Sequence, residues 1–484
     1  MAETLAQERT LRAARRPTAA TIQDLQARMR GEVLAPEAAG YDAARRVWNG
    51  MVDRKPALIA RCAGAADVLA AVAAARADRL VVAVRGGGHN VTGNAVCDGG
   101  LMLDLSPMKG IRVDPGRRTA WAQAGLTWGE FDHETQAFGL ATTGGQVSTT
   151  GIAGLTLGGG VGSLMRTCGL TVDNLLSVEL VTADGRLLRA SADAHAELFW
   201  GLRGGGGNFG VATAFEYRLH PVGPLVTGGM ALYPLARAPE ALRFLREVMA
   251  AAPDDLTLNV VFLTAPPAPF VPAPLRGQPM VAVTLFHAGP LEEGQQSMAQ
   301  LRAFGPPAVD LLGPLPYTAQ QRLLDAGVPF GQRVYLRSEH LRTLSDAAID
   351  TIVAHAAGAT SPLSFVAVYP LGGAVGRVGE HATAFGHRGT PFDIVIFSIW
   401  TDPGEDDRHL QWGRAFGAAM RPFSRGVYVN ELGVEGQARV RAAYNPQSYA
   451  RLVALKNAYD PTNLFRLNQN ISPTGETGSG PAAG

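Results

Sequence analysis

The sequence contains little cysteine, no excess of either charge and no long apolar segment. The three cysteines among 484 residues include no Cys-x-x-Cys pair, which excludes the common zinc motifs and gives no disulfide framework. Lys and Arg (43) nearly balance Asp and Glu (42), so the net charge favours neither nucleic acid nor an anionic membrane as a partner. Residues 1–20 lack the apolar core of a secretory signal, and no run of about 18 apolar residues occurs. We therefore expect a cytoplasmic protein without a membrane partner.

Glycine, by contrast, is abundant, with 58 residues. The stretch Arg85-Gly-Gly-Gly-His-Asn-Val-Thr-Gly93 directly follows the apolar run 80–84. Backbone N–H groups without side chains around them can approach a diphosphate closely, and His89 stands where a cofactor would pass. Such a short motif can equally be a flexible turn, but two further glycine-rich stretches at 144–166 and 203–210 favour a planar ligand.

The hydrophobic pattern predicts two regions of mixed helix and strand. A strand, an alanine-rich helix and a second strand over residues 57–84 form a β-α-β unit that ends on the first glycine loop. Alternation in the next strands predicts a largely antiparallel sheet, with a hairpin turn at 183–186. From about residue 223 the rhythm changes and predicts a second α+β region with one large sheet. The remaining expected strands are 101–105, 119–124, 176–182, 211–219, 259–264, 280–287 and 393–400, and the expected helices are 238–251, 291–303, 344–356 and 448–459.

The glycine motifs and the C-terminal segment resemble a known family. The stretches 85–89, 151–162, 169–174 and 203–210 look like the FAD-binding domain of the vanillyl-alcohol oxidase and p-cresol methylhydroxylase superfamily. Residues 444–471 are similar to the closing segment of berberine bridge enzyme-like oxidoreductases. The resemblance implies an α+β fold with a two-part FAD-binding domain of the p-cresol methylhydroxylase type and an α+β substrate domain built on a large antiparallel sheet. The expected units are a disordered leader (1–20), the FAD-binding domain (21–222), the substrate-binding domain (223–430), a berberine bridge-like segment that returns to the FAD domain (431–471) and a disordered tail (472–484).

The resemblance also implies the cofactor, FAD, and its contacts. The histidine of the first loop, here His89, bonds covalently to the flavin 8α-methyl group in such proteins. Many members form a second bond through a cysteine four residues before the glycine that matches Gly151; Val147 stands there, so we expect attachment through His89 only, and Cys168 to be a small buried hydrophobe. The small Thr150 favours access of oxygen. The candidate cofactor-binding residues are Arg85, Gly86, Gly87, Gly88, His89, Asn90, Gly93, Gln146, Val147, Thr150, Gly151, Gly154, Gly158, Gly160, Gly162, Asp173, Asn174, Gly207, Asn208, Gly210, Val211, Asn468 and Asn470, although the C-terminal amides could instead cap the last strand.

Two tyrosines are the candidate catalytic residues. Tyr428 matches the Tyr-x-Asn pattern of the family, and Tyr369 precedes a glycine pair where a side chain could project from the sheet. A phenol acts as a base near neutral pH only if its surroundings lower its pKa. Some members use a glutamate on a central strand, but Val395 stands near that place. Either tyrosine could instead be a packing residue.

These features favour a flavin-dependent oxidase that takes a hydride from an alcohol or amine carbon of a sugar or secondary metabolite and forms H2O2. The partners expected are a small-molecule substrate and O2, in a monomer or homodimer. The spacing of His89, His381 and His387 fits no zinc site, so no metal is expected. Two alternatives remain open: a dehydrogenase of the same fold with another electron acceptor, and a flavin-bearing protein that sequesters a drug.

Overall fold

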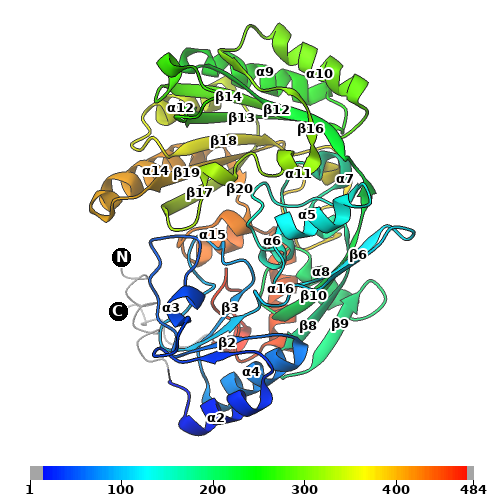
Figure 1. The fold of residues 1–484 in the computed structure, drawn as a ribbon, viewed down its shortest axis with the longest axis vertical. Helices are drawn as coiled ribbons and strands as arrows, with labels where there is room; N and C mark the ends of the chain where they lie inside the picture. The colour runs from blue at the N-terminus through cyan, green and yellow to red at the C-terminus, as the bar shows by residue number, and fades with distance from the viewer. Residues whose placement is uncertain (1–14, 477–484) are drawn as a thin grey trace.

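The computed structural model describes residues 15–476. N-terminal and C-terminal elements together form the lower half in Figure 1, and a nine-stranded sheet with its helices forms the upper half. The leader predicted at 1–20 and the tail predicted at 472–484 lie mostly outside the described residues. Within their described parts, helix α2 (Ala19–Arg28) begins at Ala19, and the Thr474 N–H donates to Asn457 Oδ1 at 2.9 Å.

The first sheet has four strands in the order β1-β2-β4-β3. It confirms the β-α-β unit, because β2 and β3 both run parallel to β4 and helix α4 (Ala65–Asp78) connects them. The expectation that the strand at 101–105 joins an antiparallel sheet is wrong: all four residues of β4 are buried, as is typical of a parallel strand covered on both faces. The strands are β1 (Val33–Leu34), β2 (Leu58–Arg61), β3 (Val82–Arg85) and β4 (Leu101–Asp104).

The second sheet is antiparallel and has the order β5-β6-β10-β8-β9. The hairpin turn predicted at 183–186 joins β8 to β9, with Gly185 at φ +82°, where glycine is favoured. The short strands β7 and β11 form a separate antiparallel pair, and after β11 the chain enters the upper half. The strands are β5 (Ile111–Asp114), β6 (Thr119–Gln123), β7 (Leu140–Ala141), β8 (Leu175–Thr182), β9 (Leu187–Ser191), β10 (Gly210–Arg218) and β11 (His220–Pro221).

The large antiparallel sheet of the upper half confirms the expected architecture. Its order is β15-β12-β14-β13-β18-β19-β17-β20, with β16 paired to β12. Helices α9, α10 and α12 cover its upper side in Figure 1, and apolar residues of α9, α12 and α14 pack on that face. The opposite face looks toward the lower half. The strands are β12 (Leu225–Pro234), β13 (Leu256–Thr264), β14 (Pro279–His287), β15 (Val309–Asp310), β16 (Gly313–Pro316), β17 (Arg333–Leu341), β18 (Phe365–Pro370), β19 (Phe392–Trp400) and β20 (Ser424–Gly426).

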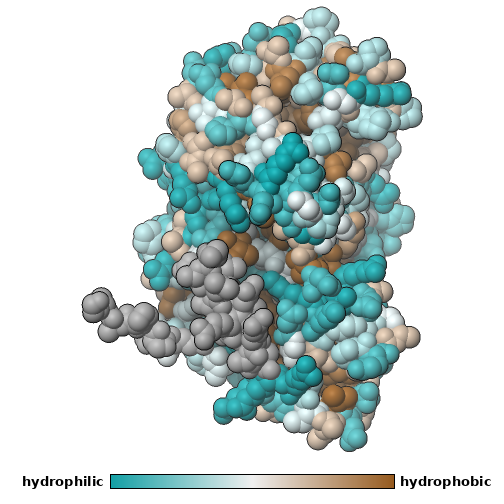
Figure 2. All heavy atoms as spheres, turned by 90° about the vertical axis from the view of Figure 1, so that its left-hand side faces the viewer, coloured by the Kyte–Doolittle hydropathy of each residue, from teal (hydrophilic) through white to brown (hydrophobic). Residues whose placement is uncertain are grey.

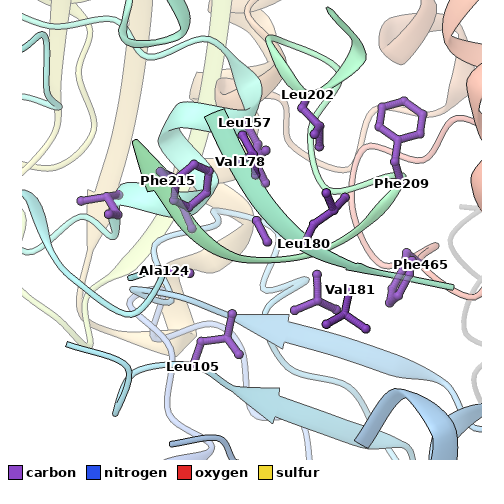
Figure 3. Packing of buried hydrophobic residues seen from close by; sticks show 14 of the residues in the cluster. Leu105, Ala124, Leu157, Val178, Leu180, Val181, Leu202, Phe209, Phe215 and Phe465 are labelled. Carbon is purple, nitrogen blue, oxygen red and sulfur yellow. The ribbon is translucent and has the colours of Figure 1, made fainter. Parts of the chain in front are cut away.

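Residues from both ends of the chain share the core of the lower half. Figure 3 shows Leu105, which follows β4, and Phe465 from the C-terminal segment in one apolar cluster with residues of β8 and β10. The face shown in Figure 2 is mostly hydrophilic, with hydrophobic residues scattered over it. No helix of residues 15–476 is long and apolar enough to cross a membrane. The other helices are α3 (Tyr41–Ala44), α5 (Trp128–Gln136), α6 (Ile152–Gly158), α7 (Met165–Cys168), α8 (Ala196–Leu202), α9 (Ala238–Ala251), α10 (Leu291–Ala303), α11 (Tyr317–Gln320), α12 (Asp346–Ala357), α13 (Ala374–Arg377), α14 (Asp406–Met420), α15 (Gln437–Ala442) and α16 (Pro446–Tyr459).

Candidate active site

Two adjoining cavities lie where the halves meet. The first, of about 290 Å³, is walled by the glycine loop after β3, by residues 145–155 and by the large sheet. The second, of about 180 Å³, continues along the lower half toward the C-terminal segment. Gly86, Asn90, Gly154 and Asn430 line both, so the two form one elongated slot. Of the predicted site residues, the first cavity is lined by Gly86, Gly87, Gly88, His89, Asn90, Gln146, Val147, Thr150, Gly151, Gly154, Tyr369 and Tyr428, and the second by Gly86, Asn90, Gly154, Gly207, Asn208, Gly210, Val211 and Asn468.

Two glycine loops touch each other at this slot. A Cβ atom on Gly87 would lie 2.3 Å from the Gly151 nitrogen, and a Cβ on Gly151 would lie 2.3 Å from the Gly87 nitrogen. Gly88 has φ +74°, a conformation that favours glycine. The glycines therefore allow a close approach of two backbones, and they leave bare backbone along the cavity wall, as binding of an extended cofactor requires.

Replacing Gly87 with alanine is expected to destabilise the fold by about 1–3 kcal/mol, because the new methyl group would collide with backbone that cannot rotate away. Urea unfolding followed by circular dichroism measures this. Gly313→Ala is the matched control, since a Cβ there meets nothing within 4 Å. Equal midpoints for the two variants would refute the close-approach argument.

His89 lies in the wall of the first cavity between two aromatic rings. Its imidazole stacks on Trp48, with ring centroids 5.2 Å apart, and meets Phe330 edge-on at 5.2 Å. Its Nε2 lies 2.9 Å from Thr149 Oγ1. Burial lowers the pKa of His89 to about 4, so the ring is neutral near pH 7 and keeps a nucleophilic nitrogen.

No cysteine accompanies His89 at the slot. Val147 lines the first cavity, as expected for the position where a second attachment would be. Cys168 lies outside both cavities and packs, partly buried, beside Leu164 and Tyr317. Burial also raises the pKa of the Cys168 thiol to about 12, which leaves it unreactive.

The C-terminal segment closes the second cavity. Asn208 Oδ1 accepts a hydrogen bond from the Ile471 N–H at 2.9 Å, and Asn468 Nδ2 donates to the Gly207 carbonyl at 3.1 Å. Asn468 Oδ1 is buried beside the cavity without a hydrogen-bond partner, so it can accept a bond from a bound group. Gln469 and the glycines Gly205 and Gly206 of the predicted loop 203–210 line the second cavity as well, and Asn94 is a lining residue that was not predicted.

Arg85, a predicted cofactor-binding residue, lines neither cavity. Its guanidinium binds Asp104 through Nη2 at 2.7 Å and donates to the Ala44 carbonyl at 2.6 Å. Asp104 is fully buried, and a buried carboxylate needs a cation, so this partnership determines the direction of the Arg85 side chain. Arg85 therefore stabilises the loop through contacts with Asp104 and Ala44.

Other predicted positions also support the slot without lining either cavity. Asp173 Oδ1 accepts a hydrogen bond from Arg388 Nη2 at 2.6 Å, and Asn174 Oδ1 accepts one from His220 Nε2 at 2.6 Å. The other predicted residues that line neither cavity pack on neighbouring protein atoms. These are Gly93 on Val52, Gly158 on Asn430, Gly160 on Thr171, Gly162 on Gly144, and Asn470, whose Nδ2 donates to Ser472.

Both candidate tyrosines face the first cavity. The Tyr428 oxygen accepts hydrogen bonds from the Gly160 N–H and from Asn430 Nδ2, both at 2.8 Å, which leaves its own proton for a third group. Burial raises the pKa of Tyr428, and the Glu431 carboxyl raises it further. Burial likewise raises the pKa of Tyr369. In these surroundings both are neutral phenols near pH 7 and serve as hydrogen-bonding groups.

The cavity also holds a carboxyl group that the sequence analysis missed. Glu431, three residues after Tyr428, lines the first cavity. Asp393 lies behind it on β19, fully buried. Val395, on the same strand, occupies the place where a glutamate was considered and is itself buried. Among residues 15–476 no three His, Cys, Asp or Glu side chains form a group that could hold a metal ion.

Two family matches agree with this geometry. Residues 56–191 match the FAD binding domain family, and residues 427–472 match the family described as berberine and berberine like. The chain is 33% identical to an FAD-linked oxidoreductase of Dictyostelium discoideum, over 88% of this chain and 91% of that one. It is 31% identical to (R)-6-hydroxynicotine oxidase of Paenarthrobacter nicotinovorans, over 92% and 98% of the two chains.

Solved structures show the same fold. The crystal structure of 6-hydroxy-D-nicotine oxidase from Arthrobacter nicotinovorans superimposes with a TM-score of 0.81 at 29% identity, covering 92% of this chain and 98% of that one. Berberine bridge enzyme from Eschscholzia californica gives a TM-score of 0.82 at 21% identity, covering 94% and 99%. The glycine-walled slot, its histidine and these relatives lead to one conclusion: the chain belongs to the berberine bridge enzyme-like family and is an FAD-dependent oxidoreductase.

Proposed function

We propose that the protein is an FAD-dependent oxidase that oxidises an alcohol or amine carbon of a small molecule and produces H2O2. The observation that carries the proposal is the slot itself. Its second cavity is a glycine-walled channel for a long cofactor. This channel opens into the first cavity, against the large sheet, which His89, Tyr369, Tyr428 and Glu431 line. Bound FAD would supply the two-electron acceptor and pass the electrons to O2.

His89 is the proposed covalent anchor. A neutral imidazole fixed between Trp48 and Phe330 presents a ring nitrogen in one orientation, which is what bond formation to the flavin 8α-methyl group needs. Thr150, whose Oγ1 lies 3.5 Å from His89 Nδ1, leaves more space beside the ring than a larger aliphatic residue would. This supports reaction with O2.

The part of the first cavity that lies against the large sheet, called the substrate compartment below, can bind the apolar part of a substrate and orient one polar group. Phe365, Phe397 and Leu336 come from the sheet, and Leu324 and Val328 come from the segment between α11 and β17; together they supply its apolar wall and exclude water. Tyr428 offers its proton to a bound oxygen or nitrogen, since its own lone pairs are occupied by Gly160 and Asn430. The substrate's reactive group is therefore expected near Tyr428.

A substrate panel tests the proposal directly. We expect a compound among sugars, aromatic alcohols and cyclic amines, with 6-hydroxynicotine included because of the oxidase relative, to bleach the flavin without oxygen. Admission of air should restore the colour with one H2O2 for each substrate oxidised, measured by a peroxidase-coupled assay. Bleaching with no H2O2 would identify a dehydrogenase instead. Tight binding without bleaching by any compound would identify a binding protein.

A further inference from the structure

A buried pair of carboxyl groups stands at the floor of the substrate compartment. Tyr369, Asp393 and His340 are register partners across β18, β19 and β17, so their side chains share the sheet face that looks toward the lower half. Glu431 reaches the same place from the turn after Tyr428 and lines the cavity. Glu431 and Asp393 lie close enough that each carboxyl affects the pKa of the other, so the two ionise as a coupled pair.

The surroundings leave this pair without a cation. Glu431 Oε2 and both Asp393 oxygens are buried without any donor from the described residues 15–476. His340 lies with Nε2 3.9 Å from Asp393 Oδ1, but burial lowers the pKa of His340 to about 3, so it is neutral. The nearby arginines are bound elsewhere. Arg439 pairs with Glu339 at 2.8 Å, and Arg337 pairs with Glu435 at 2.7 Å.

Burial therefore controls when the pair ionises. It raises the pKa of Asp393 well above its ordinary value, and raises that of Glu431 to about 7. The other groups that face the pair are Ser338, Glu339 and His340 on β17, Tyr369 on β18, Tyr428 and His387. No lysine or arginine is among them.

From this arrangement we infer that Glu431 is the group that accepts the substrate's proton, and that Asp393 positions it and controls when it ionises. The inference rests on the oxidase function proposed above. As the carbon–hydrogen bond of an alcohol breaks and its electron pair leaves for the flavin, the hydroxyl proton passes to Glu431 and the carbon–oxygen double bond forms. Reduction of O2 to H2O2 takes up two electrons and two protons, one of which is the proton held by Glu431, so the pair returns to its starting state.

The test compares Glu431→Gln and Asp393→Asn in the holoenzyme. Flavin absorbance, titrated without substrate, should show a transition near pH 7 that Glu431→Gln removes. Anaerobic flavin reduction by the best compound of the panel should fall by about 10²-fold or more in Glu431→Gln and lose its dependence on pH. Asp393→Asn should instead move the transition to lower pH and keep most of the rate at high pH, because an amide donates to the Glu431 carboxylate without adding charge.

Asp132→Asn is the matched control. Asp132 is also buried, and burial raises its pKa to about 7, but it does not line the slot. The inference is overturned if Glu431→Gln keeps the wild-type pH profile, or if Asp393→Asn leaves the transition where it was. A panel in which nothing reduces the flavin would defeat the oxidase proposal, while the absorbance titration would still decide whether Glu431 is the ionising group of the cavity.

Discussion

Protein with His89 replaced by alanine is expected to lose all of its covalently bound flavin. Among the described residues, the nucleophilic side chain of His89 lies in the wall of the first cavity, and the family resemblance places it at the 8α-methyl group. Its pKa of about 4 keeps a ring nitrogen unprotonated at neutral pH. Acid precipitation releases flavin that is bound noncovalently and leaves covalently attached flavin in the precipitate. The wild-type precipitate should be yellow and the His89→Ala precipitate colourless, with the flavin recovered in the supernatant.

Two control variants make this result specific. Cys168→Ala should remain yellow, because Cys168 lies away from both cavities. His133→Ala, which removes an exposed imidazole on α5, should also remain yellow. A yellow precipitate from His89→Ala would show that another residue attaches the cofactor, and a colourless one from Cys168→Ala would show that His89 alone does not hold it.

The second large effect is expected at Lys456, on α16. Its ammonium group is fully buried and donates to Asp460 Oδ2 at 2.8 Å and to the carbonyls of Asn208 and Phe465, each at 3.0 Å. Lys456→Met leaves the Asp460 carboxylate buried without its cation. Because loss of one partner of a buried ion pair costs about 3–5 kcal/mol, we expect the free energy of unfolding to fall by that amount.

Urea unfolding measures this loss, and Lys109→Met is the matched control. Lys109 pairs with Glu130 at 2.5 Å, but both side chains are 40% or more exposed, so its replacement should cost less than about 1 kcal/mol. A loss at Lys456 no larger than that at Lys109 would contradict the argument. Replacing Lys456 and Asp460 together by apolar residues should recover part of the stability, since no unpaired charge then remains.

The parts of the site that depend on backbone could be predicted from the sequence. Glycine at 86–88 and at 151 is a local signal. Only glycine allows these two backbones to lie so close, because a Cβ on Gly87 would be 2.3 Å from the Gly151 nitrogen. The β-α-β unit and the hairpin at Gly185 follow from local periodicity and turn chemistry in the same way. Such features need no knowledge of distant residues.

Side-chain direction could not be predicted in this way. Arg85 faces Asp104 because β3 and β4 pair in parallel, and the sequence alone does not show this pairing. Glu431 and Asp393 are 38 positions apart, and they meet only because β17 pairs with both β19 and β20. Strand β17, Arg333–Leu341, was not predicted, because two arginines, a glutamate and a histidine obscure its alternation. Glu435 and Arg439 supply the ion-pair partners that allow Arg337 and Glu339 in a buried strand.

The closure of the second cavity by residues 464–471 has a consequence for how the holoenzyme forms. This segment follows every other part of the slot in the chain, and its anchor, Lys456, bonds to Asn208 and Phe465 only after the tail has folded back. During synthesis the glycine loops therefore emerge long before the wall that completes their cavity. Stable capture of the cofactor is therefore expected only after residues 464–471 have folded, and the proposed attachment at His89 is expected to be a late event in maturation.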